Sequence, residues 1–396
     1  MLTLVGQRWL RVFLILRHLI SWLLEIPDNG AMGSSLALAE RDRLALIDSA
    51  RRAVLGGEEP RRPLPIEPWL ERSWRRCLAL GQRPEQRLAF DSVSGPARLR
   101  LVEANQSLIQ AARPVLERLC ETLASSRYFA VLTDRDGVVI DSHGPIDRTD
   151  RRADLITRIG VDLSETAVGT TAIGAALTEL QPVWLHRGEH FFADTSVYSC
   201  AGAPLFGPDG RCIGMLDLTG IETAERPELK HLAAQSARSI ENALVQRLPH
   251  ALLLRLNWPG RALGGPDDGL VCLDADGWVQ GSNDAARQML PQLALPGAAT
   301  HAGELFAQRC ESWFDLARRS APAAPVEVAL WSGLRLQAVP QFPGQPTVAV
   351  PNKVPLRDVE IALIRKAVAD ARGNVMKAAQ ALGISRATVY RKLGKK

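Results

Sequence analysis

The sequence is poor in cysteine, and its cysteines form no pattern. Six cysteines are scattered over 396 residues, without CxxC pairs or the Cys/His spacing of a zinc site. We therefore predict no metal site, no disulfide framework and no cofactor. Free thiols fit a reduced, cytoplasmic setting. The six are Cys77, Cys120, Cys200, Cys212, Cys272 and Cys310.

Signatures of catalysis are also missing. The chain has no G-x-x-x-x-G-K-[ST] phosphate loop, no H-E-x-x-H pair and no G-x-S-x-G turn. An enzyme hypothesis would rest on Cys200 and His190 alone, ten residues apart. We keep a small-molecule or redox enzyme as a rival interpretation, and predict that the chain is not an enzyme.

No hydrophobic run is long enough for a confident membrane span. The most apolar stretch, Val12 to Leu24, contains Arg17 and His18 and is shorter than the roughly 20 apolar residues that a spanning helix needs. We expect that translation starts at Met32, ahead of a Ser-capped amphipathic helix, and that residues 1–31 are an extension of doubtful status. A membrane-surface helix or a signal peptide are the alternatives. No membrane partner is predicted.

Charge is unevenly distributed along the chain. Residues 351–396 contain 11 Lys and Arg against 3 Asp and Glu, a net charge of 11 − 3 = +8, whereas the whole chain carries +5. Everything before residue 351 therefore sums to −3. A basic block at one end indicates a polyanionic partner for that block. A solvated charged tail is the alternative.

The middle of the chain predicts an α+β fold. Helical periodicity over 32–125 gives way to a hairpin around the DRDG turn at 134–137, and a second hairpin is expected around 207–210. A capped helix should follow Ser164, a strand is expected at 182–185, and one long helix should cover 227–248. We predict an antiparallel sheet flanked by helices over residues 126–250.

A second unit of the same kind is predicted over residues 260–341. The segment "DGLVCLDADGWVQGSNDAARQML" repeats the order of strand, DADG turn, strand and Asn-started helix. Residues 342–355 are rich in Pro and Gly, which predicts a linker. Residues 356–396 form the basic, all-α block.

The basic block has the pattern of a helix-turn-helix. Gly373 ends one helix and Asn374 starts the next, where Ala379 allows a close helix crossing. Gly383 permits the turn, and Val389 and Leu393 should face inward from the last helix. We predict that Arg386 reads a guanine edge and that most of the other outward residues hold phosphates. The predicted DNA-binding set is Ser385, Arg386, Thr388, Tyr390, Arg391 and Lys392. A helical hairpin that binds protein is the alternative.

The stretch "GNVMKAAQALGISRATVYRKL" resembles the Fis-type helix-turn-helix that ends many bacterial enhancer-binding regulators. Members of that family bind inverted repeats as dimers. The resemblance therefore implies sequence-specific DNA and a homodimer as partners, with RNA polymerase as a further one.

Residues 128–248 resemble the GAF domain of acetoin and glycerol catabolism regulators. The motifs "SETAVGTTAIGAAL", "GEHFF" and "CAGAPLFGPDGRCIGMLDLTG" carry this resemblance. It implies a small effector, such as an alcohol, diol or carbonyl compound, in an apolar cavity with a few polar groups. Each candidate also has a structural interpretation, as a helix cap, a satisfied imidazole or a strand-end residue. The candidates are Glu165, Thr170, Thr171, His190, Phe191, Cys200 and Asp217. Residues 268–290 resemble a degenerate PAS unit.

Enhancer-binding relatives carry a central ATPase that remodels sigma-54 polymerase, and this sequence has no phosphate loop for one. We predict an effector-responsive transcription regulator without ATPase activity, whose GAF-like sensor controls its helix-turn-helix. An anti-activator, or a partner of a full-length sigma-54 activator, is the alternative.

Overall fold

The computed structural model describes residues 29–56, 66–90, 93–295, 299–319, 325–345, Val368, 375–381, Arg386, Val389 and Tyr390. The extension before residue 29 and the predicted linker beyond residue 345 lie outside the described residues. Contacts divide the chain into two compact units. The first contains the described residues up to Ile109, with Leu116–Pro204 and Gly214–Ala234. The second contains Gln110–Val115, Leu205–Ile213 and the described residues from Gln235 on.

Within the described residues, four helices precede the first sheet: α2 (Asn29–Leu55), α3 (Pro68–Ala79), α4 (Gly95–Ala104) and α5 (Gln106–Leu123). The start of α2 at Asn29 shows that the predicted serine cap after Met32 is wrong, because those serines lie inside the helix. The helix α3 is amphipathic. It begins with Pro68 in the first turn, where a missing N–H costs nothing, and buries Trp69 and Trp74.

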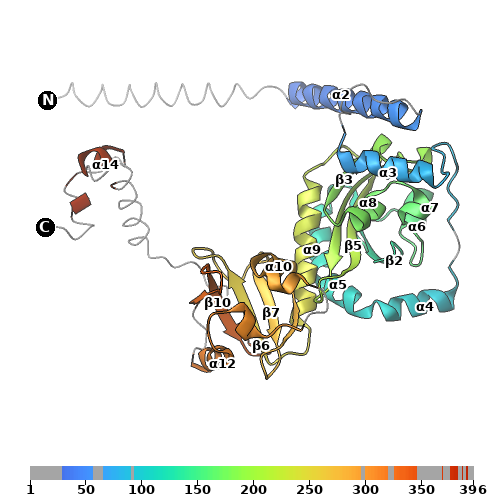
Figure 1. The fold of residues 1–396 in the computed structure, drawn as a ribbon. Coiled ribbons are helices and arrows are strands. Elements are labelled where there is room, and N and C mark those ends of the chain that lie inside the picture. Colours follow the sequence, from blue (N-terminus) through green and yellow to red (C-terminus); the bar gives the residue numbers. More distant parts are fainter. Residues whose placement is uncertain are drawn as a thin grey trace, which may run out of the picture. The chain divides into compact units, whose positions relative to one another are not determined.

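The first sheet has five strands in the order β2-β1-β5-β4-β3. Figure 1 labels β2, β5 and β3 of this sheet. The pairs β1–β2, β1–β5 and β3–β4 are antiparallel, which confirms the predicted α+β class. The strands are β1 (Tyr128–Asp134), β2 (Val139–His143), β3 (Val183–His186), β4 (Tyr198–Phe206) and β5 (Cys212–Ile221). Both predicted hairpins are present. In the first turn, Asp134 Oδ1 accepts hydrogen bonds of 3.0 Å from the N–H groups of Asp136 and Val138, and Gly137 takes a φ of 84°.

Short helices cover this sheet: α6 (Arg151–Ile156), α7 (Glu165–Val168), α8 (Ala172–Glu179), η1 (Arg187–Glu189) and η2 (Ala193–Thr195). The single helix predicted after Ser164 is two helices, α7 and α8. They are separated at Gly169, whose φ is 66° and where a Cβ would lie 2.8 Å from the Phe192 ring. Thr171 then caps α8, since its Oγ1 accepts from Gly174 N at 3.2 Å.

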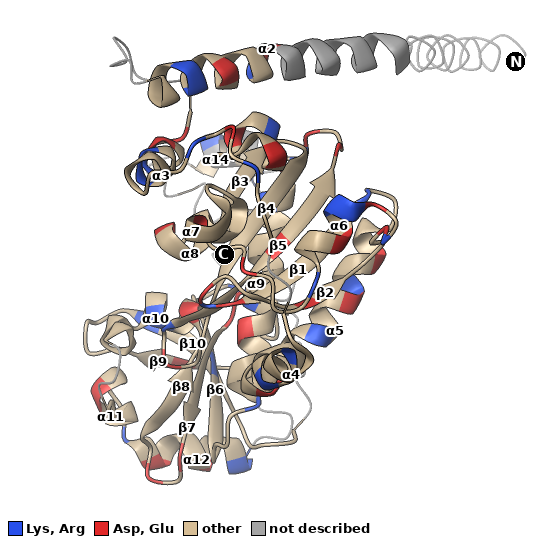
Figure 2. Cartoon of the chain, turned by 90° about the vertical axis from the view of Figure 1, so that its right-hand side faces the viewer, with Lys and Arg blue, Asp and Glu red and all other residues tan. Residues whose placement is uncertain are grey.

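The core of the first unit joins these helices to the strands. Trp74 of α3, Ala172 and Ala176 of α8, and Val131 and Met215 of the sheet are all fully buried in one cluster. Charged residues lie mainly on helices and loops, while the strands are largely uncharged (Figure 2). The helices therefore pack on the sheet through apolar side chains. The few polar groups that are buried there require an explanation.

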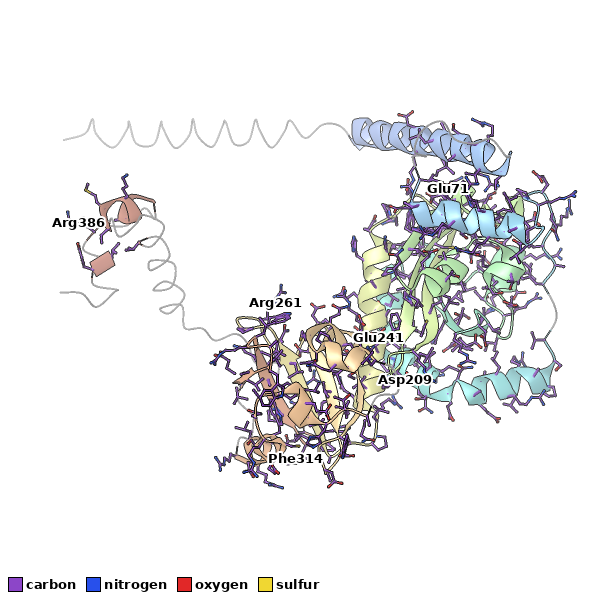
Figure 3. The ribbon with its side chains drawn as sticks, in the orientation of Figure 1. Glu71, Asp209, Glu241, Arg261, Phe314 and Arg386 are labelled. Carbon is purple, nitrogen blue, oxygen red and sulfur yellow. The ribbon has the colours of Figure 1, made fainter. Side chains whose placement is uncertain are left out.

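The long helix predicted over 227–248 is α9 (Leu229–Gln246), somewhat shorter at both ends. Its residues from Gln235 on belong to the second unit. In that unit, the buried Glu241 (Figure 3) accepts a hydrogen bond of 2.8 Å from Phe206 N.

The second sheet has the order β8-β7-β6-β10-β9, with antiparallel pairs throughout. The central strand β6 precedes the predicted module boundary at residue 260. The turn predicted to repeat the first hairpin does so, because Asp274 Oδ1 accepts from Asp276 N and Trp278 N. The strands are β6 (Leu252–Asn257), β7 (Gly269–Leu273), β8 (Val279–Ser282), β9 (Val326–Ala329) and β10 (Arg335–Gln341).

Helices α10 (Asp284–Met289), η3 (Pro291–Ala294), α11 (Ala302–Leu305) and α12 (Cys310–Arg319) accompany the second sheet. The predicted Asn-started helix is α10, since Asn283 Oδ1 accepts from Ala286 N at 2.9 Å. Phe306 and Trp313 fill the core with ring centroids 5.0 Å apart. Side chains therefore occupy the interior on this side of the sheet.

The described part of the basic block includes α14 (Val375–Ala381). Ala379 and the fully buried Val389 form a small core, with Val368 and Val375 packed against it. This is the inward placement that the sequence predicts for Ala379 and Val389. Among all described helices, none combines the length and the apolar character that crossing a bilayer requires.

Candidate functional site

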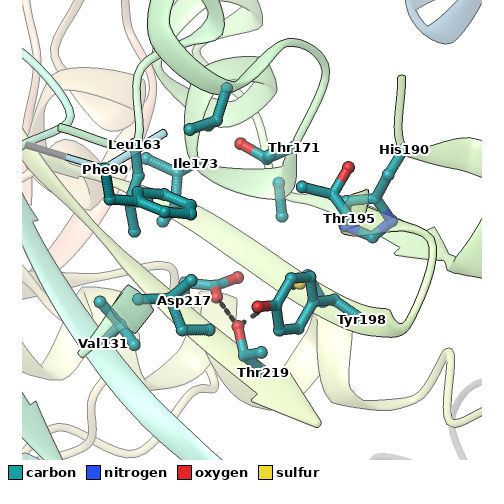
Figure 4. Close-up of a pocket in the computed structure, with 14 residues that line it drawn as sticks. Phe90, Val131, Leu163, Thr171, Ile173, His190, Thr195, Tyr198, Asp217 and Thr219 are labelled. Carbon is teal, nitrogen blue, oxygen red and sulfur yellow. Dashed lines mark hydrogen bonds between the residues drawn. The ribbon is translucent and has the colours of Figure 1, made fainter. Parts of the chain in front are cut away.

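The first unit contains a small, mostly buried cavity of about 30 Å³ (Figure 4). This is room for one or two water-sized molecules. All of its lining residues are buried except Phe90 and Thr171, which are partly exposed and so mark where it approaches solvent. The lining comprises Phe90, Val131, Ile156, Leu163, Val168, Thr171, Ala172, Ile173, His190, Thr195, Tyr198, Cys200, Asp217 and Thr219.

Asp217 is the principal polar group of the cavity wall. It projects from β5, and its Oδ2 accepts the Thr219 hydroxyl, while its Oδ1 is buried without a hydrogen-bond partner. Burial raises the pKa of Asp217 to about 7, so near neutral pH the proton is readily gained or lost. A buried carboxyl oxygen without a partner is costly, and a bound molecule could supply that partner.

Cys200 stands on the neighbouring strand β4. Its Sγ lies 3.4 Å from Thr219 Oγ1, and burial with Asp217 nearby raises the pKa of the thiol well above its usual range. The sulfur is therefore a neutral thiol rather than a nucleophilic thiolate. A neutral thiol gives no support to an enzyme built on Cys200 and His190.

His190 presents an unpaired ring nitrogen to the cavity. Its Nδ1 lies 3.0 Å from the Arg187 carbonyl oxygen, which can only accept, so Nδ1 carries the hydrogen. Burial lowers the pKa of His190 to about 4, so the ring is neutral and Nε2 bears a lone pair. Nε2 is buried and has no partner. The cavity thus offers an acceptor at Nε2 and a carboxyl oxygen at Asp217.

Four of the seven candidate effector residues line the cavity: Thr171, His190, Cys200 and Asp217. The other three lie outside its lining and have other contacts. Glu165 Oε1 accepts from Arg76 Nε at 2.7 Å, and its Oε2 accepts from Ser73 Oγ at 2.5 Å. Thr170 Oγ1 lies 2.7 Å from Ser73 Oγ, and Phe191 is buried edge-to-face against Phe192.

Sequence reasoning missed Phe90, Thr195, Tyr198 and Thr219 as cavity residues. Thr219 had a readable signal, since residues two apart on a strand face the same side and Asp217 was already a candidate. Phe90 had none, because it lies in a coil segment far from the sheet in sequence. That segment is held by two hydrogen bonds, Ala193 N to Pro84 O at 2.8 Å and Leu88 N to Asp194 Oδ2 at 3.1 Å.

The described residues include no group of three or more His, Cys, Asp or Glu side chains able to hold a metal ion. The cavity wall combines apolar side chains with the polar atoms Asp217 Oδ1 and His190 Nε2, which are buried without hydrogen-bond partners. Such a site suits a compact molecule without net charge, because an unpaired charge would be costly to bury.

The predicted DNA-binding helix is described at three positions. Arg386 (Figure 3) and Tyr390 are exposed and helical, and Val389 between them is fully buried. The helix thus has an inward face at Val389 and an outward face that includes Arg386, as the sequence predicts. Ser385, Thr388, Arg391 and Lys392 lie outside the described residues.

Two family models match the chain. Residues 67–242 match the N-terminal domain of MimR, and residues 355–395 match the Fis family of bacterial regulatory proteins. The chain is homologous to acetoin- and MimR-type regulators. The predicted resemblance of the sensor and of the helix-turn-helix is therefore confirmed, with the first match ending inside α9.

The acetoin catabolism regulatory protein of Cupriavidus necator is 31% identical over 255 residues, which is 62% of this chain and 37% of that protein. The propane 2-monooxygenase operon transcriptional activator MimR of Mycolicibacterium goodii is 32% identical over 184 residues, 46% of this chain and 30% of that protein. The matched part thus amounts to about a third of these relatives' length.

Among solved structures, the E. coli DhaR(N)–DhaL complex aligns with 69% of this chain and 99% of the matched chain. The identity is 17% and the TM-score is 0.42.

Proposed function

We propose that this protein is an effector-responsive transcription regulator that binds specific DNA through residues 356–396 under the control of the GAF-like sensor. The observation that carries the proposal is the cavity wall, where Asp217 Oδ1 and His190 Nε2 are buried without partners. The same chain ends in a Fis-type domain. The regulator is not an enzyme and works in the cytoplasm.

The effector is a small uncharged alcohol, diol or carbonyl compound, and the cavity of about 30 Å³ widens when it binds. A hydroxyl group donates to His190 Nε2, and Asp217 either accepts a second hydroxyl or, when protonated, donates to a carbonyl oxygen. Two relatives are named for acetoin catabolism and for a propane 2-monooxygenase operon, which supports compounds of this size. Thr171, at the partly exposed end of the cavity, provides a third polar contact.

DNA is bound by a homodimer at an inverted repeat. Arg386 reads a base edge, and Ser385, Thr388, Tyr390, Arg391 and Lys392 complete the contact surface. Effector binding changes the packing of α9, which leaves the sensor, and so alters how the two DNA-binding domains are presented. A coupling of about 1 to 3 kcal/mol would change DNA affinity by about 5- to 150-fold.

The protein acts without an ATPase of its own, since the sequence has no phosphate loop. If this chain contacts RNA polymerase, it does so without remodelling the polymerase by ATP hydrolysis. The same observation favours one second candidate function. An anti-activator would occupy the site of a full-length sigma-54 activator, or pair with it.

The test is genome-wide crosslinking of the native protein to DNA, compared with an Arg386→Ala, Arg391→Ala double variant. Discrete sites that share an inverted repeat and disappear in the variant support the regulator. Sites that coincide with those of a sigma-54 activator support the anti-activator. Crosslinking that the two substitutions leave unchanged would overturn DNA recognition by this helix.

The effector is tested by thermal shift and titration calorimetry of the full chain with acetoin, 2,3-butanediol, dihydroxyacetone and 2-propanol. Binding that weakens at least about tenfold in Asp217→Asn, and not in the exposed control Asp136→Asn, supports the cavity as the site. Binding that is equal in both variants would place the ligand elsewhere.

A further inference from the structure

Four consecutive carbonyl oxygens beside the cavity are bound by two helices that precede the sheet. Arg51 of α2 donates from Nη1 to Gly188 O at 2.8 Å and also to His190 O, and from Nη2 to Phe191 O at 2.9 Å. Trp74 of α3 donates from Nε1 to Glu189 O at 2.9 Å. We call Arg51, Trp74 and these four carbonyl groups the carbonyl clasp.

The clasp compensates for a backbone segment that pairs with no strand. Residues 187–192 follow β3 and form the single turn η1 and the coil after it, so the carbonyl groups of 188–191 need partners from elsewhere. A guanidinium provides donors in a fixed planar fork, and hydrogen bonds from a charged donor are stronger than neutral ones. The Arg51 guanidinium also lies 5.7 Å from the centre of the Trp74 ring.

A second cation on α2 reaches the same segment. Arg43 Nη2 contacts Glu189 Oε1 at 3.0 Å, and its Nη1 contacts Glu225 Oε1 at 2.8 Å. Arg43 and Arg51, two turns apart on α2, therefore both bind the segment before β4, and Arg43 also binds Glu225 after β5. The helix is fastened to this segment by its charged side chains, and Ile47 and Val54 beside them are buried.

The clasp determines where the His190 ring lies. The ring is fixed by its own Nδ1 contact to Arg187 O, and the backbone on either side of it is fixed by Arg51. Without Arg51, the carbonyl groups of Gly188, His190 and Phe191 lose their charged donor, and the segment can move together with the ring. The position of Nε2 in the cavity therefore depends on a helix far away in sequence.

We propose that α2 is part of the sensor, and that Arg51 is a positioning residue that couples the docking of α2 to occupation of the cavity. The proposal rests on the proposed function in one respect, that the effector contacts His190. The matched MimR N-terminal domain begins at residue 67, so α2 lies outside it. Because coupling is reciprocal, an effector that orders His190 also stabilises docked α2, and docked α2 raises affinity for the effector.

The first experiment needs no ligand. Amide hydrogen exchange is measured on the full chain for Arg51→Gln and for Arg52→Gln, an exposed arginine on the same helix that gives the same change in charge. We expect the amides of 188–192, two of them bonded to Arg187 O and Thr170 O, to exchange about tenfold faster or more in Arg51→Gln alone. The amides of β1 and β5 report any global loss of stability and should change much less.

Equal exchange of residues 188–192 in the two variants would overturn the clasp. If Arg51→Gln does not fold, Arg51→Lys replaces it. Lysine keeps the charge but not the planar fork. We therefore expect the amides of 188–192 to exchange faster than in the wild type, but more slowly than if all the hydrogen bonds of Arg51 were lost. Exchange of Arg51→Lys at the wild-type rate would likewise overturn the proposal.

The second experiment measures coupling, with acetoin and 2,3-butanediol as probes. A bound probe should slow exchange of the amides of 45–55 in the wild type and in Arg52→Gln. In Arg51→Gln, probe affinity should fall about tenfold and the protection of α2 should be lost. Unchanged affinity, or α2 amides that do not respond to a bound probe, would overturn the coupling.

The two experiments separate the two ideas. Failure of every probe to bind the wild type counts against the proposed effector class and the coupling together, whereas the exchange comparison decides the clasp alone. Probe binding that weakens in Asp217→Asn but not in Arg51→Gln would keep the effector site and overturn the role of α2.

Discussion

Asp217 and Thr219 face the same side of β5, two residues apart, and the Thr219 hydroxyl donates to the Asp217 carboxyl inside the cavity wall. The folded protein holds the Asp217 proton up to about pH 7, whereas an unfolded aspartate releases it near pH 4. The contribution of Asp217 to the free energy of unfolding is therefore largest below about pH 4, and it falls as the pH rises to about 7.

We predict that Asp217→Asn removes this loss. The free energy of unfolding of the variant, relative to wild type, should rise by about 1.4 kcal/mol for each pH unit between about 4 and 7, and then level. Urea denaturation at a series of pH values measures it. Glu189 and Glu241 are also buried with pKa values raised to about 7, so the difference between variant and wild type is the quantity to follow. A difference that does not vary with pH would show that Asp217 is not the titrating group.

Phe90 should limit the size of the effector. It is a partly exposed wall of the cavity, so Phe90→Ala enlarges the space and should improve binding of 3,4-hexanediol relative to 2,3-butanediol by about tenfold or more. Titration calorimetry measures the ratio. Phe314→Ala, at a partly buried phenylalanine of the second unit, is the matched control and should leave the ratio unchanged. An unchanged ratio in Phe90→Ala would mean that another wall sets the limit.

Glu165 should act on stability through its partners on α3. It accepts two hydrogen bonds from Arg76 and one from Ser73, so Glu165→Gln should lower the free energy of unfolding by about 1.5 to 3 kcal/mol. The exposed pair Glu71–Arg75 provides the control, and Glu71→Gln should cost less than about 0.5 kcal/mol. Chemical denaturation compares them. Similar small losses in the two variants would show that the partly buried network of Glu165 contributes little to stability.

Arg386 and Lys392 should differ in what they contribute to DNA binding. Arg386→Ala should cost about 1 to 3 kcal/mol and relax the preference at one base position, because it removes a contact to a base edge. Lys392→Ala should weaken binding to all sequences and lower the salt slope by about one, because it removes a phosphate contact. Binding to randomised operators at several salt concentrations distinguishes them. Equal, sequence-independent losses would contradict the assignment of Arg386.

Local patterns in the sequence predicted much of the fold. The Asp-x-x-Gly turns at Asp134 and Asp274 could be read directly, since an aspartate that accepts from two following N–H groups needs only its near neighbours. The same holds for the inward Val389 and the outward Arg386, which follow from helical spacing.

What could not be read depends on contacts between distant residues. Thr171 was a candidate ligand contact, and its place as the cap of α8 follows from the break at Gly169, where packing against Phe192 leaves no room for a side chain. Phe90 and Arg51 reach the site from outside the matched sheet motifs. No spacing rule indicates which arginine of a charged helix will bind three carbonyl groups 137 to 140 residues away.

The burial of the cavity affects how long a molecule stays bound, as well as how tightly it binds. Twelve of its fourteen lining residues are shielded from solvent, so a bound molecule leaves only when the wall near Phe90 and Thr171 opens. For the proposed effector, we therefore expect a residence time that is set by how often the protein opens, rather than by the contacts alone. With slow opening, the proposed regulator would average over brief changes in effector concentration and respond to those that last.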